Sequence, residues 1–91
     1  MKYVVRHTAA FKRDYKLMLK RHLPVGKLRA VVAKLANDEA LPAANRDHAL
    51  SGSWANHREC HVAPDWLLIY QIHENLLVLE LTRTGTHSDL F

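Results

Sequence analysis

Residues 61–70 read HVAPDWLLIY, and this stretch decides how the second half of the chain folds. Its centre, Ala63-Pro64-Asp65, predicts a turn, because proline presets one backbone angle and aspartate bonds to nearby backbone groups. The run from Trp66 to Ile72 is apolar on both faces, which is typical of a central strand that is covered on both sides. The preceding residues 57–62 (HRECHV) alternate as a strand does. The stretch therefore predicts two strands joined by a turn that carries polar side chains.

The segments on either side extend this pattern. Residues 73–75 (HEN) predict a tight reversal and residues 76–82 a third strand, so the C-terminal half is expected to form an antiparallel meander. Residues 39–56 combine proline, glycine and scattered polar residues, which predicts a loop with room for one helical turn. Long ordered loops in small domains often carry function.

The first 38 residues predict a strand followed by two helices. Residues 2–7 are short and β-branched, and Thr8 suits the N-cap of a helix from Ala9 to about His22. Pro24 suits the first turn of a second helix. Apolar residues fall at helical spacing in both helices: Phe11, Tyr15, Met18 and Leu19, then Val25, Leu28, Val32 and Leu35. The expected fold is one α+β domain, residues 1–91, in the order β-α-α-β-β-β, with an antiparallel sheet and both helices on one face.

Composition narrows the class of protein. The single Cys60 excludes an internal disulfide framework and a zinc site built on several thiolates, and it fits a reducing compartment. The apolar run at the N-terminus is too short for a signal peptide, and no stretch approaches the ~20 apolar residues of a membrane helix. We therefore expect a soluble, cytoplasmic protein that has no membrane partner.

Charge is distributed unevenly along the chain. Residues 1–34 hold ten Lys and Arg residues and one acid, Asp14, whereas residues 35–91 hold three Lys and Arg residues and eight acids. A basic half of this kind favours a polyanionic partner, with nucleic acid as the first candidate. The alternative is an ordinary solvated helix surface that is rich in lysine.

Five of the seven histidines lie in the second half, and three of them fall where loops or strand ends are expected. His48 lies in the long loop, His61 at the proline turn and His87 after the last strand. Asp65 shares the turn with His61, and Arg83 stands at the end of the last strand. In a meander, alternate strand ends meet at one rim of the sheet, so these five residues can share a cleft.

These residue types suit metal-independent cleavage of RNA, which needs a base for the 2′-OH, an acid for the 5′ oxygen and a cation for the phosphate. Histidine titrates near neutral pH and fills either proton role, and arginine offers a planar fork to phosphate oxygens. Trp66 and Phe91 are candidates for stacking on a base. The competing interpretation makes each histidine an ordinary surface residue, Trp66 a core residue and Phe91 a frayed end.

A metal site is another chemical interpretation. His57 and His61 would share one face of a helix, with Asp65 following at the same spacing. In a strand, however, the two histidines lie about 13 Å apart, which is too far to share a zinc ion. The prediction is therefore no metal and no cofactor.

Three segments together resemble one family. DHALSGSW (47–54), HVAPDWLLIY (61–70) and RTGTHSDLF (83–91), combined with the basic two-helix first half, closely resemble the YafQ-type toxins of the RelE/ParE superfamily. The resemblance covers nearly the whole chain and implies a compact, microbial-ribonuclease-like (RelE-like) fold. It implies a toxin of a type II toxin–antitoxin system that cleaves mRNA at the A-site codon of the translating ribosome. The implied partners are mRNA, ribosomal RNA and a cognate antitoxin, which binds operator DNA through a separate domain.

The resemblance also assigns roles to residues. It implies that His48, His61, Asp65, Arg83 and His87 are catalytic and that Trp66 and Phe91 bind substrate, with Glu59 as a less certain acidic member. We expect His87 to act as general acid and His48 or His61 as base, with Asp65 orienting a histidine and sustaining its proton affinity. Two alternatives stay open: a superfamily member that binds and inhibits DNA gyrase without cutting RNA, and a non-catalytic nucleic-acid-binding domain.

Overall fold

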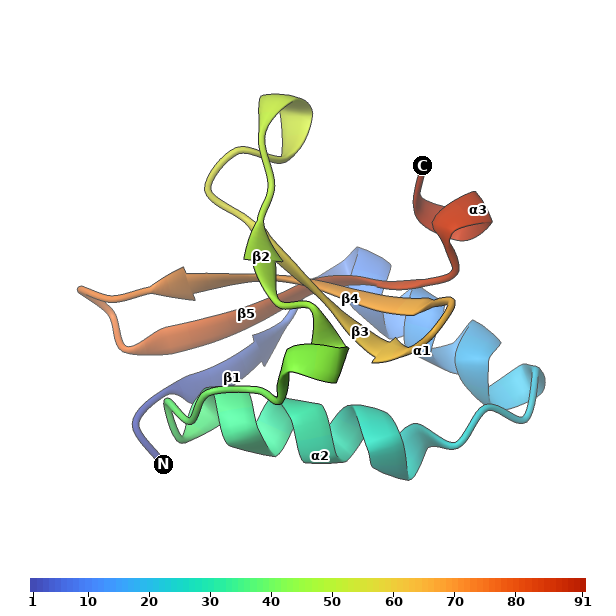
Figure 1. Cartoon of the computed structure of the whole chain (residues 1–91), viewed down its shortest axis with the longest axis horizontal. Coiled ribbons are helices and arrows are strands. Elements are labelled where there is room, and N and C mark those ends of the chain that lie inside the picture. The colour runs from blue at the N-terminus through green and yellow to red at the C-terminus, as the bar shows by residue number, and fades with distance from the viewer.

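The structure, a computed structural model, describes all residues from 1 to 91. One five-stranded sheet is covered on one side by two helices (Figure 1). The strands are β1 (Val4–His7), β2 (His48–Ala49), β3 (Arg58–Ala63), β4 (Trp66–His73) and β5 (Val78–Gly85). The helices are α1 (Ala9–Lys20), α2 (Val25–Ala36) and α3 (His87–Leu90), and two 3-10 turns, η1 (Ala43–Asn45) and η2 (Gly52–Trp54), lie in the long loop. None of these helices has the length and apolar character to span a bilayer.

The helical hairpin forms for the reasons that its sequence indicates. The Thr8 side chain accepts a hydrogen bond from the backbone N–H of Phe11, so it caps α1 as expected. α2 begins directly after Pro24 and ends at Ala36, close to the expected end. The buried residues of both helices belong to one hydrophobic cluster with the inner face of the sheet: Phe11, Met18, Leu28, Val31 and Leu35 from the helices, and Val62, Trp66, Leu68, Tyr70, Leu79 and Leu81 from the strands.

The sheet order is β1-β5-β4-β3-β2, and β3, β4 and β5 form the expected antiparallel meander. The expectation of a purely antiparallel sheet is wrong at one edge, because β1 pairs with β5 in parallel, with Val4 opposite Val78 and His7 opposite Leu81. A parallel neighbour requires a long crossover between the paired segments. Here the crossover consists of α1, α2 and the strands β2 to β4, and it brings the first strand of the chain beside the last.

Strand β4 is central and buried on both faces. Trp66, Leu68 and Tyr70 point to the helices, whereas Leu67 and Ile69 alternate to the opposite face and are also fully buried. This confirms the central position predicted from the apolar run. The face of Leu67 and Ile69 is the one on which the candidate site is built.

Three features depart from the expected elements. β5 begins at Val78 and runs to Gly85, so Leu76 and Leu77 fall in the turn and are exposed. The long loop contains a short strand, β2, which adds an edge to the sheet beside β3. The C-terminal residues form a helical turn, α3.

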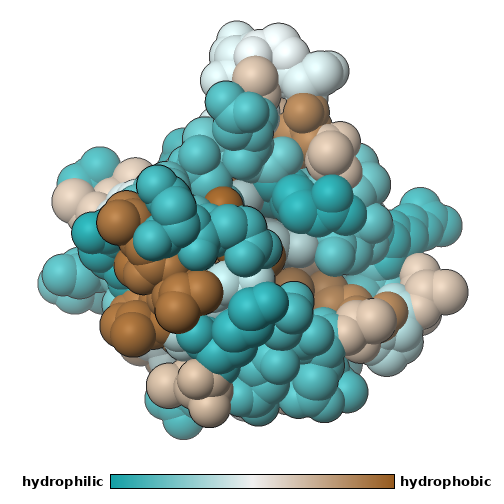
Figure 2. Space-filling model, turned by 90° about the vertical axis from the view of Figure 1, so that its left-hand side faces the viewer, coloured by the Kyte–Doolittle hydropathy of each residue, from teal (hydrophilic) through white to brown (hydrophobic).

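Figure 2 looks at the side of the molecule where the N-terminus and the β4–β5 turn lie, and it shows hydrophobic surface among the polar groups there.

Candidate active site

Strand register places four predicted site residues on the sheet face opposite the helices. His48 lies opposite Glu59, Glu59 opposite Ile69, and Ile69 opposite Arg83. Directly paired residues project from the same face, so these positions form one row across four strands. His61 lies two residues after Glu59 on β3 and therefore projects from that face in the next row.

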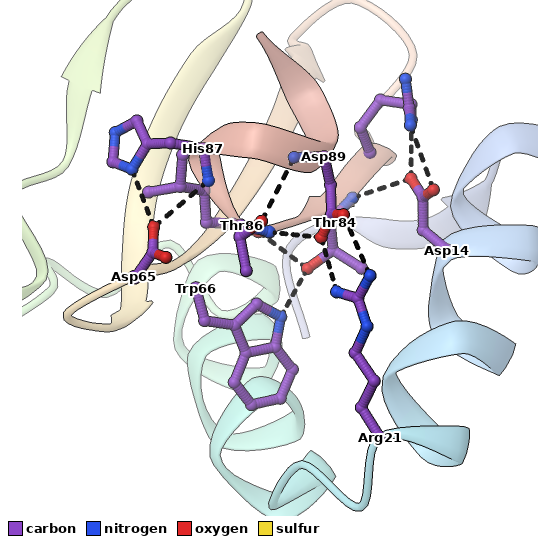
Figure 3. A network of polar contacts seen from close by, with 10 residues as sticks. Asp14, Arg21, Asp65, Trp66, Thr84, Thr86, His87 and Asp89 are labelled. Atoms are coloured by element: carbon purple, nitrogen blue, oxygen red, sulfur yellow. Dashed lines mark hydrogen bonds and ion pairs between the residues drawn. The ribbon is translucent and has the colours of Figure 1, made fainter.

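Asp65 and His87 are in direct contact, although 22 positions separate them in sequence. The Nδ1–H of His87 donates to Oδ1 of Asp65 at 3.0 Å, and the backbone N–H of His87 donates to the same oxygen at 3.2 Å (Figure 3). The bonds from the His87 side chain and backbone hold the pKa of the Asp65 carboxyl below its ordinary value. The His61 ring lies beside this pair, with its centroid 5.9 Å from that of His87. The structure thus brings together three of the five predicted catalytic residues.

The hydrogen bonds of the histidines define which ring nitrogen is available. Nδ1 of His61 lies 3.2 Å from the carbonyl oxygen of Pro64, and Nδ1 of His48 lies 2.6 Å from that of Arg46. A carbonyl oxygen only accepts, so Nδ1 carries the proton in both rings. In the neutral imidazoles, Nε2 is then the basic nitrogen, which is the form a general base requires.

His48 forms a second group with Glu59, at some remove from His87. Its Nε2 lies 3.7 Å from Oε1 of Glu59, a carboxylate that is only 5% exposed. The adjacent Asp47 fixes the loop that carries His48, because its Oδ1 accepts hydrogen bonds from the Tyr70 hydroxyl at 2.5 Å and from Nε of Arg58 at 3.2 Å. The loop position of His48 is therefore anchored to the sheet.

Arg83 is held by α1. Its Nε donates to Oδ2 of Asp14 at 2.6 Å and its Nη2 to Oδ1 at 3.1 Å, and the backbone N–H of Thr84 also donates to Oδ2 at 3.1 Å. A guanidinium has five N–H donors, and Asp14 engages two of them. Nη1 takes part in neither bond, so the ion pair orients the guanidinium without using its whole donor set. Asp14 is the lone acid of the basic half, and nothing in its sequence context predicts this pairing.

The short helix α3 carries His87 and is tied down by Asp89. Thr86 and Asp89 form a reciprocal capping box, in which the Thr86 N–H donates to Oδ2 of Asp89 at 2.9 Å. Arg21 at the end of α1 donates to both oxygens of the same carboxylate, at 2.7 and 3.1 Å (Figure 3). The Arg21 bonds and the Thr86 backbone bond hold the pKa of Asp89 well below its ordinary value. A helix of four residues has little stability of its own, so these contacts hold His87 in place.

The expected stacking role of Trp66 is wrong for this structure. Its side chain is 3% exposed and belongs to the hydrophobic cluster. The indole Nε1–H donates to the Thr84 hydroxyl at 2.9 Å, and this hydroxyl donates to the carbonyl of Leu67 at 2.7 Å. Trp66 thus joins the start of β4 to the end of β5. These strand ends carry the neighbouring residues Asp65 and Arg83, so Trp66 stabilises the part of the sheet on which the candidate site is built.

Phe91, in contrast to Trp66, lies at the surface. It is 62% exposed, its ring centroid lies 6.3 Å from that of His87, and its N–H donates to the His87 carbonyl at 2.8 Å. Its ring also meets the edge of Trp54, with centroids 6.4 Å apart. The structure therefore places Trp54, from the long loop, beside the C-terminal tail that carries His87.

The side chains do not converge as ligands of a metal ion. No group of three or more His, Cys, Asp and Glu side chains is arranged to hold one. His57 precedes β3 and His61 lies within it, so the two histidines do not share a helix face. Cys60 is buried, and burial raises the pKa of its thiol to about 12, which removes it from nucleophilic or ligand roles.

The architecture and the polar face are those expected for the toxin class named from the motifs, and comparison with known proteins agrees. Residues 3–91 match the family model described as bacterial toxin of type II toxin-antitoxin system, YafQ. The chain is 43% identical over 88 residues to the mRNA interferase toxin YafQ of Escherichia coli K12, covering 96% of this chain and 94% of that protein. The chain therefore belongs to the YafQ toxin family.

Solved structures give the same result. The YafQ chain of an E. coli DinJ–YafQ complex superposes with a TM-score of 0.89 at 40% identity, covering 98% of both chains. A metal-bound toxin from Helicobacter pylori superposes with a TM-score of 0.92 at 37% identity, covering 98% of this chain and 99% of that one. The predicted family and fold class are thus confirmed.

Proposed function

We propose that this chain is an endoribonuclease that cleaves mRNA at the A-site codon of the translating ribosome by general acid–base catalysis without a catalytic metal. The observation that carries the proposal is the contact of Asp65 with His87, beside the ring of His61. The similar E. coli protein is an mRNA interferase, which indicates the substrate class. Two imidazoles and one orienting carboxylate supply the proton donor and acceptor that the reaction needs.

In the proposed reaction, the 2′ oxygen attacks the adjacent phosphorus while Nε2 of His61 or His48 removes its proton. The bond from phosphorus to the 5′ oxygen breaks, and His87, which enters this step with both ring nitrogens protonated, delivers the Nε2 proton to the departing oxygen. The products are a 2′,3′-cyclic phosphate and a 5′-hydroxyl. Asp65 accepts the Nδ1–H of His87 and so directs Nε2 outward. Each well-placed proton transfer contributes about 10²–10⁴ in rate.

Between the two candidate bases, proximity favours His61. Its ring is adjacent to His87, whereas His48 lies against Glu59 on the outer strand pair. His61→Ala and His48→Ala test this preference, because loss of the base should remove the acidic limb of the pH–rate profile, where protonation of the base lowers the rate. A larger loss in His48→Ala than in His61→Ala would reverse the assignment.

Arg83 is proposed to stabilise the charge that grows on the phosphate. Its pair with Asp14 fixes the guanidinium, and the unengaged Nη1 is available to a phosphate oxygen. Arg83→Lys keeps a charge but loses the planar fork, so it should recover only part of the activity that Arg83→Ala loses. Full activity in Arg83→Ala would remove this role.

The basic helices are proposed to hold the protein against ribosomal RNA. Lys and Arg side chains on α1 and α2 are exposed: Lys12, Arg13, Lys16, Lys20, Lys27, Arg29 and Lys34. Binding through such cations releases counterions and weakens steeply with salt. Affinity for ribosomes that barely changes between low and high salt would contradict this part of the proposal.

A cognate antitoxin is the proposed protein partner, as in the E. coli DinJ–YafQ complex. The surface that fits it is an apolar groove of about 590 Å³ between β1, α1 and α2, lined by Val5, Phe11, Leu28 and Val32 with the cations Lys12, Lys16 and Arg29. An amphipathic segment with acidic flanks complements this lining. Val32→Glu should abolish complex formation and leave RNA cleavage intact, while Ala30→Glu, at an exposed position of the same helix outside the groove, serves as the control and should form the complex.

The experiment that tests the proposed function compares a translating extract with naked mRNA. Wild type should cut mRNA only when ribosomes translate it, at positions in phase with the codons, and His87→Ala should cut neither. Cleavage of naked mRNA at the same sites would contradict ribosome dependence. Toxicity that persists in a His61→Ala, His87→Ala double variant would instead favour the gyrase-binding alternative.

Metal independence needs a separate control, because ribosomes require Mg²⁺ and a similar toxin from H. pylori has been solved with bound metal. A chelator selective for transition metals, added while Mg²⁺ is kept constant, should leave the cleavage rate unchanged. Loss of cleavage that added zinc or copper restores would contradict the metal-independent scheme.

A further inference from the structure

Five aromatic rings form a continuous row that starts at the candidate catalytic residues. Successive ring centroids are 5.9 Å apart from His61 to His87, 6.3 Å from His87 to Phe91, 6.4 Å from Phe91 to Trp54 and 5.4 Å from Trp54 to His57. The five residues come from β3, the C-terminal tail and the loop around η2. Trp54 and His57, which lie beyond Phe91 in this row, have no part in the proposed proton transfers.

No neighbouring rings in this row are stacked face to face. The interplanar angles are 57°, 39°, 70° and 83° in the same order. Stacked rings cover each other, whereas edge-to-face contacts leave at least one ring face uncovered. Phe91 is exposed and Trp54 is partly exposed. The row therefore offers aromatic faces to a flat ligand.

Trp54 has no evident structural reason for its position. It is absent from the hydrophobic cluster, and its indole nitrogen makes no hydrogen bond within the protein, in contrast to Trp66, which has both. Its ring contacts are with His57 and Phe91. A large aromatic side chain at the surface, next to an exposed aromatic tail, is the composition of a binding surface rather than of a core.

Hydrogen bonds hold the backbone that carries Trp54. Its N–H donates to the Ser51 carbonyl at 3.2 Å, and its carbonyl accepts from the His57 N–H at 3.1 Å. The His57 ring is fixed in turn by a 3.0 Å hydrogen bond between Nδ1 and the Ala55 carbonyl. A ring carried on an ordered backbone and backed by a fixed neighbouring ring costs less conformational freedom on binding than one on a mobile loop.

We propose that Trp54, backed by His57, forms a nucleobase-stacking subsite for the RNA segment next to the scissile phosphate. The inference rests on the proposed nuclease function, since it extends the same ring row from His87. Only Phe91 stands between Trp54 and His87 in the row, which places the stacked base close to the cleavage point. Every base has an aromatic face, so the subsite should tolerate all four bases and add affinity more than sequence preference.

The test uses the two tryptophans as reporters. The probe is a short 2′-O-methyl RNA oligonucleotide, which lacks the attacking hydroxyl and so binds without being cleaved. Stacking on Trp54 should quench its fluorescence, while the buried Trp66 should stay unaffected. Trp54→Phe should abolish the quenching and keep affinity within a few-fold, because it retains a ring. Trp54→Ala should weaken binding by about 5- to 150-fold, and Leu76→Ala, at the exposed β4–β5 turn, should bind as wild type does.

Several results would overturn the subsite: no quenching in wild type at saturating oligonucleotide, full quenching in Trp54→Phe, or wild-type affinity in Trp54→Ala. Thermal unfolding of each variant, expected to match wild type, separates a binding defect from a folding defect. The subsite and the nuclease function fail separately. Oligonucleotide binding that depends on Trp54 without cleavage in a translating extract would remove only the nuclease, whereas cleavage that is equal in Trp54→Ala and wild type would remove only the subsite.

Discussion

Two threonines on β5 should respond differently to the same substitution: one variant should lose stability and the other should not. Thr84 is 1% exposed, and its hydroxyl accepts from the Trp66 indole at 2.9 Å and donates to the Leu67 carbonyl at 2.7 Å. The hydroxyl of Thr82, two residues earlier, is buried and has no hydrogen-bond partner. Valine has nearly the shape of threonine, so Thr→Val removes the hydroxyl at each position with little change in packing.

The magnitudes follow from what each hydroxyl leaves behind. In Thr84→Val the buried Trp66 N–H loses its acceptor, and an unsatisfied buried donor costs about 1–3 kcal/mol. For a domain of this size that corresponds to a fall in Tm of about 5–20 °C. In Thr82→Val an already unsatisfied group is removed, so stability should stay equal or rise by up to about 2 kcal/mol.

Urea unfolding at pH 7, followed by Trp fluorescence and by circular dichroism, measures both variants. The single variant Trp66→Phe and the Trp66→Phe, Thr84→Val double variant complete a double-mutant cycle. The stability losses of the two single variants should not add in the double variant, because each single change already breaks the same hydrogen bond. Equal stabilities of Thr84→Val and wild type, or a Thr82→Val loss as large as that of Thr84→Val, would refute the bonding that we assign to the end of β5.

Three further predictions concern titratable groups. The Cys60 thiol, with its pKa raised to about 12 by burial, should resist alkylation at pH 8 in the folded protein and react at once in urea, and rapid labelling of the native protein would contradict its burial. The Asp65 carboxyl should titrate below its ordinary pKa in carbon-detected NMR and move up in His87→Ala, and an unchanged midpoint in that variant would exclude their hydrogen bond. The pKa of the Asp89 carboxyl is lower in the folded than in the unfolded protein, so its ionisation stabilises the fold at pH values above the unfolded pKa near 4, and this stability is lost as pH falls toward the folded pKa. In Arg21→Ala, the free energy of unfolding measured in urea should therefore fall less on acidification than in wild type. An equal fall in the variant and in wild type would show that the pair contributes nothing.

The elements that could be predicted from the sequence are those set by local patterns. The helices follow from apolar spacing and the Thr8 cap, and β4 follows from its doubly apolar run. The parallel pairing of β1 with β5 could not be predicted, because it depends on contacts between the two ends of the chain. The helix α3 had a signal that was overlooked: Thr86 and Asp89 stand at capping-box spacing.

The candidate catalytic side chains could be predicted from the sequence better than the residues that hold them in place. Histidines at turns and strand ends pointed to one rim, and Asp65, His61 and His87 do meet there. The sequence left Trp66 open between a core position and a stacking position, because both faces of β4 are apolar. Asp14 offered a clue as the lone acid among ten cations, but its pairing with Arg83 across 69 positions needs the three-dimensional structure.

The chemistry of the cleaved mRNA ends tests the central claim most directly. Fragments from a translating extract treated with wild-type protein should end in a 2′,3′-cyclic phosphate, or the 3′-phosphate formed from it, and begin with a 5′-hydroxyl, and His87→Ala should yield no such fragments. Fragments with a 3′-hydroxyl and a 5′-phosphate, or undiminished cleavage by His87→Ala, would contradict acid–base catalysis by the Asp65–His87–His61 group.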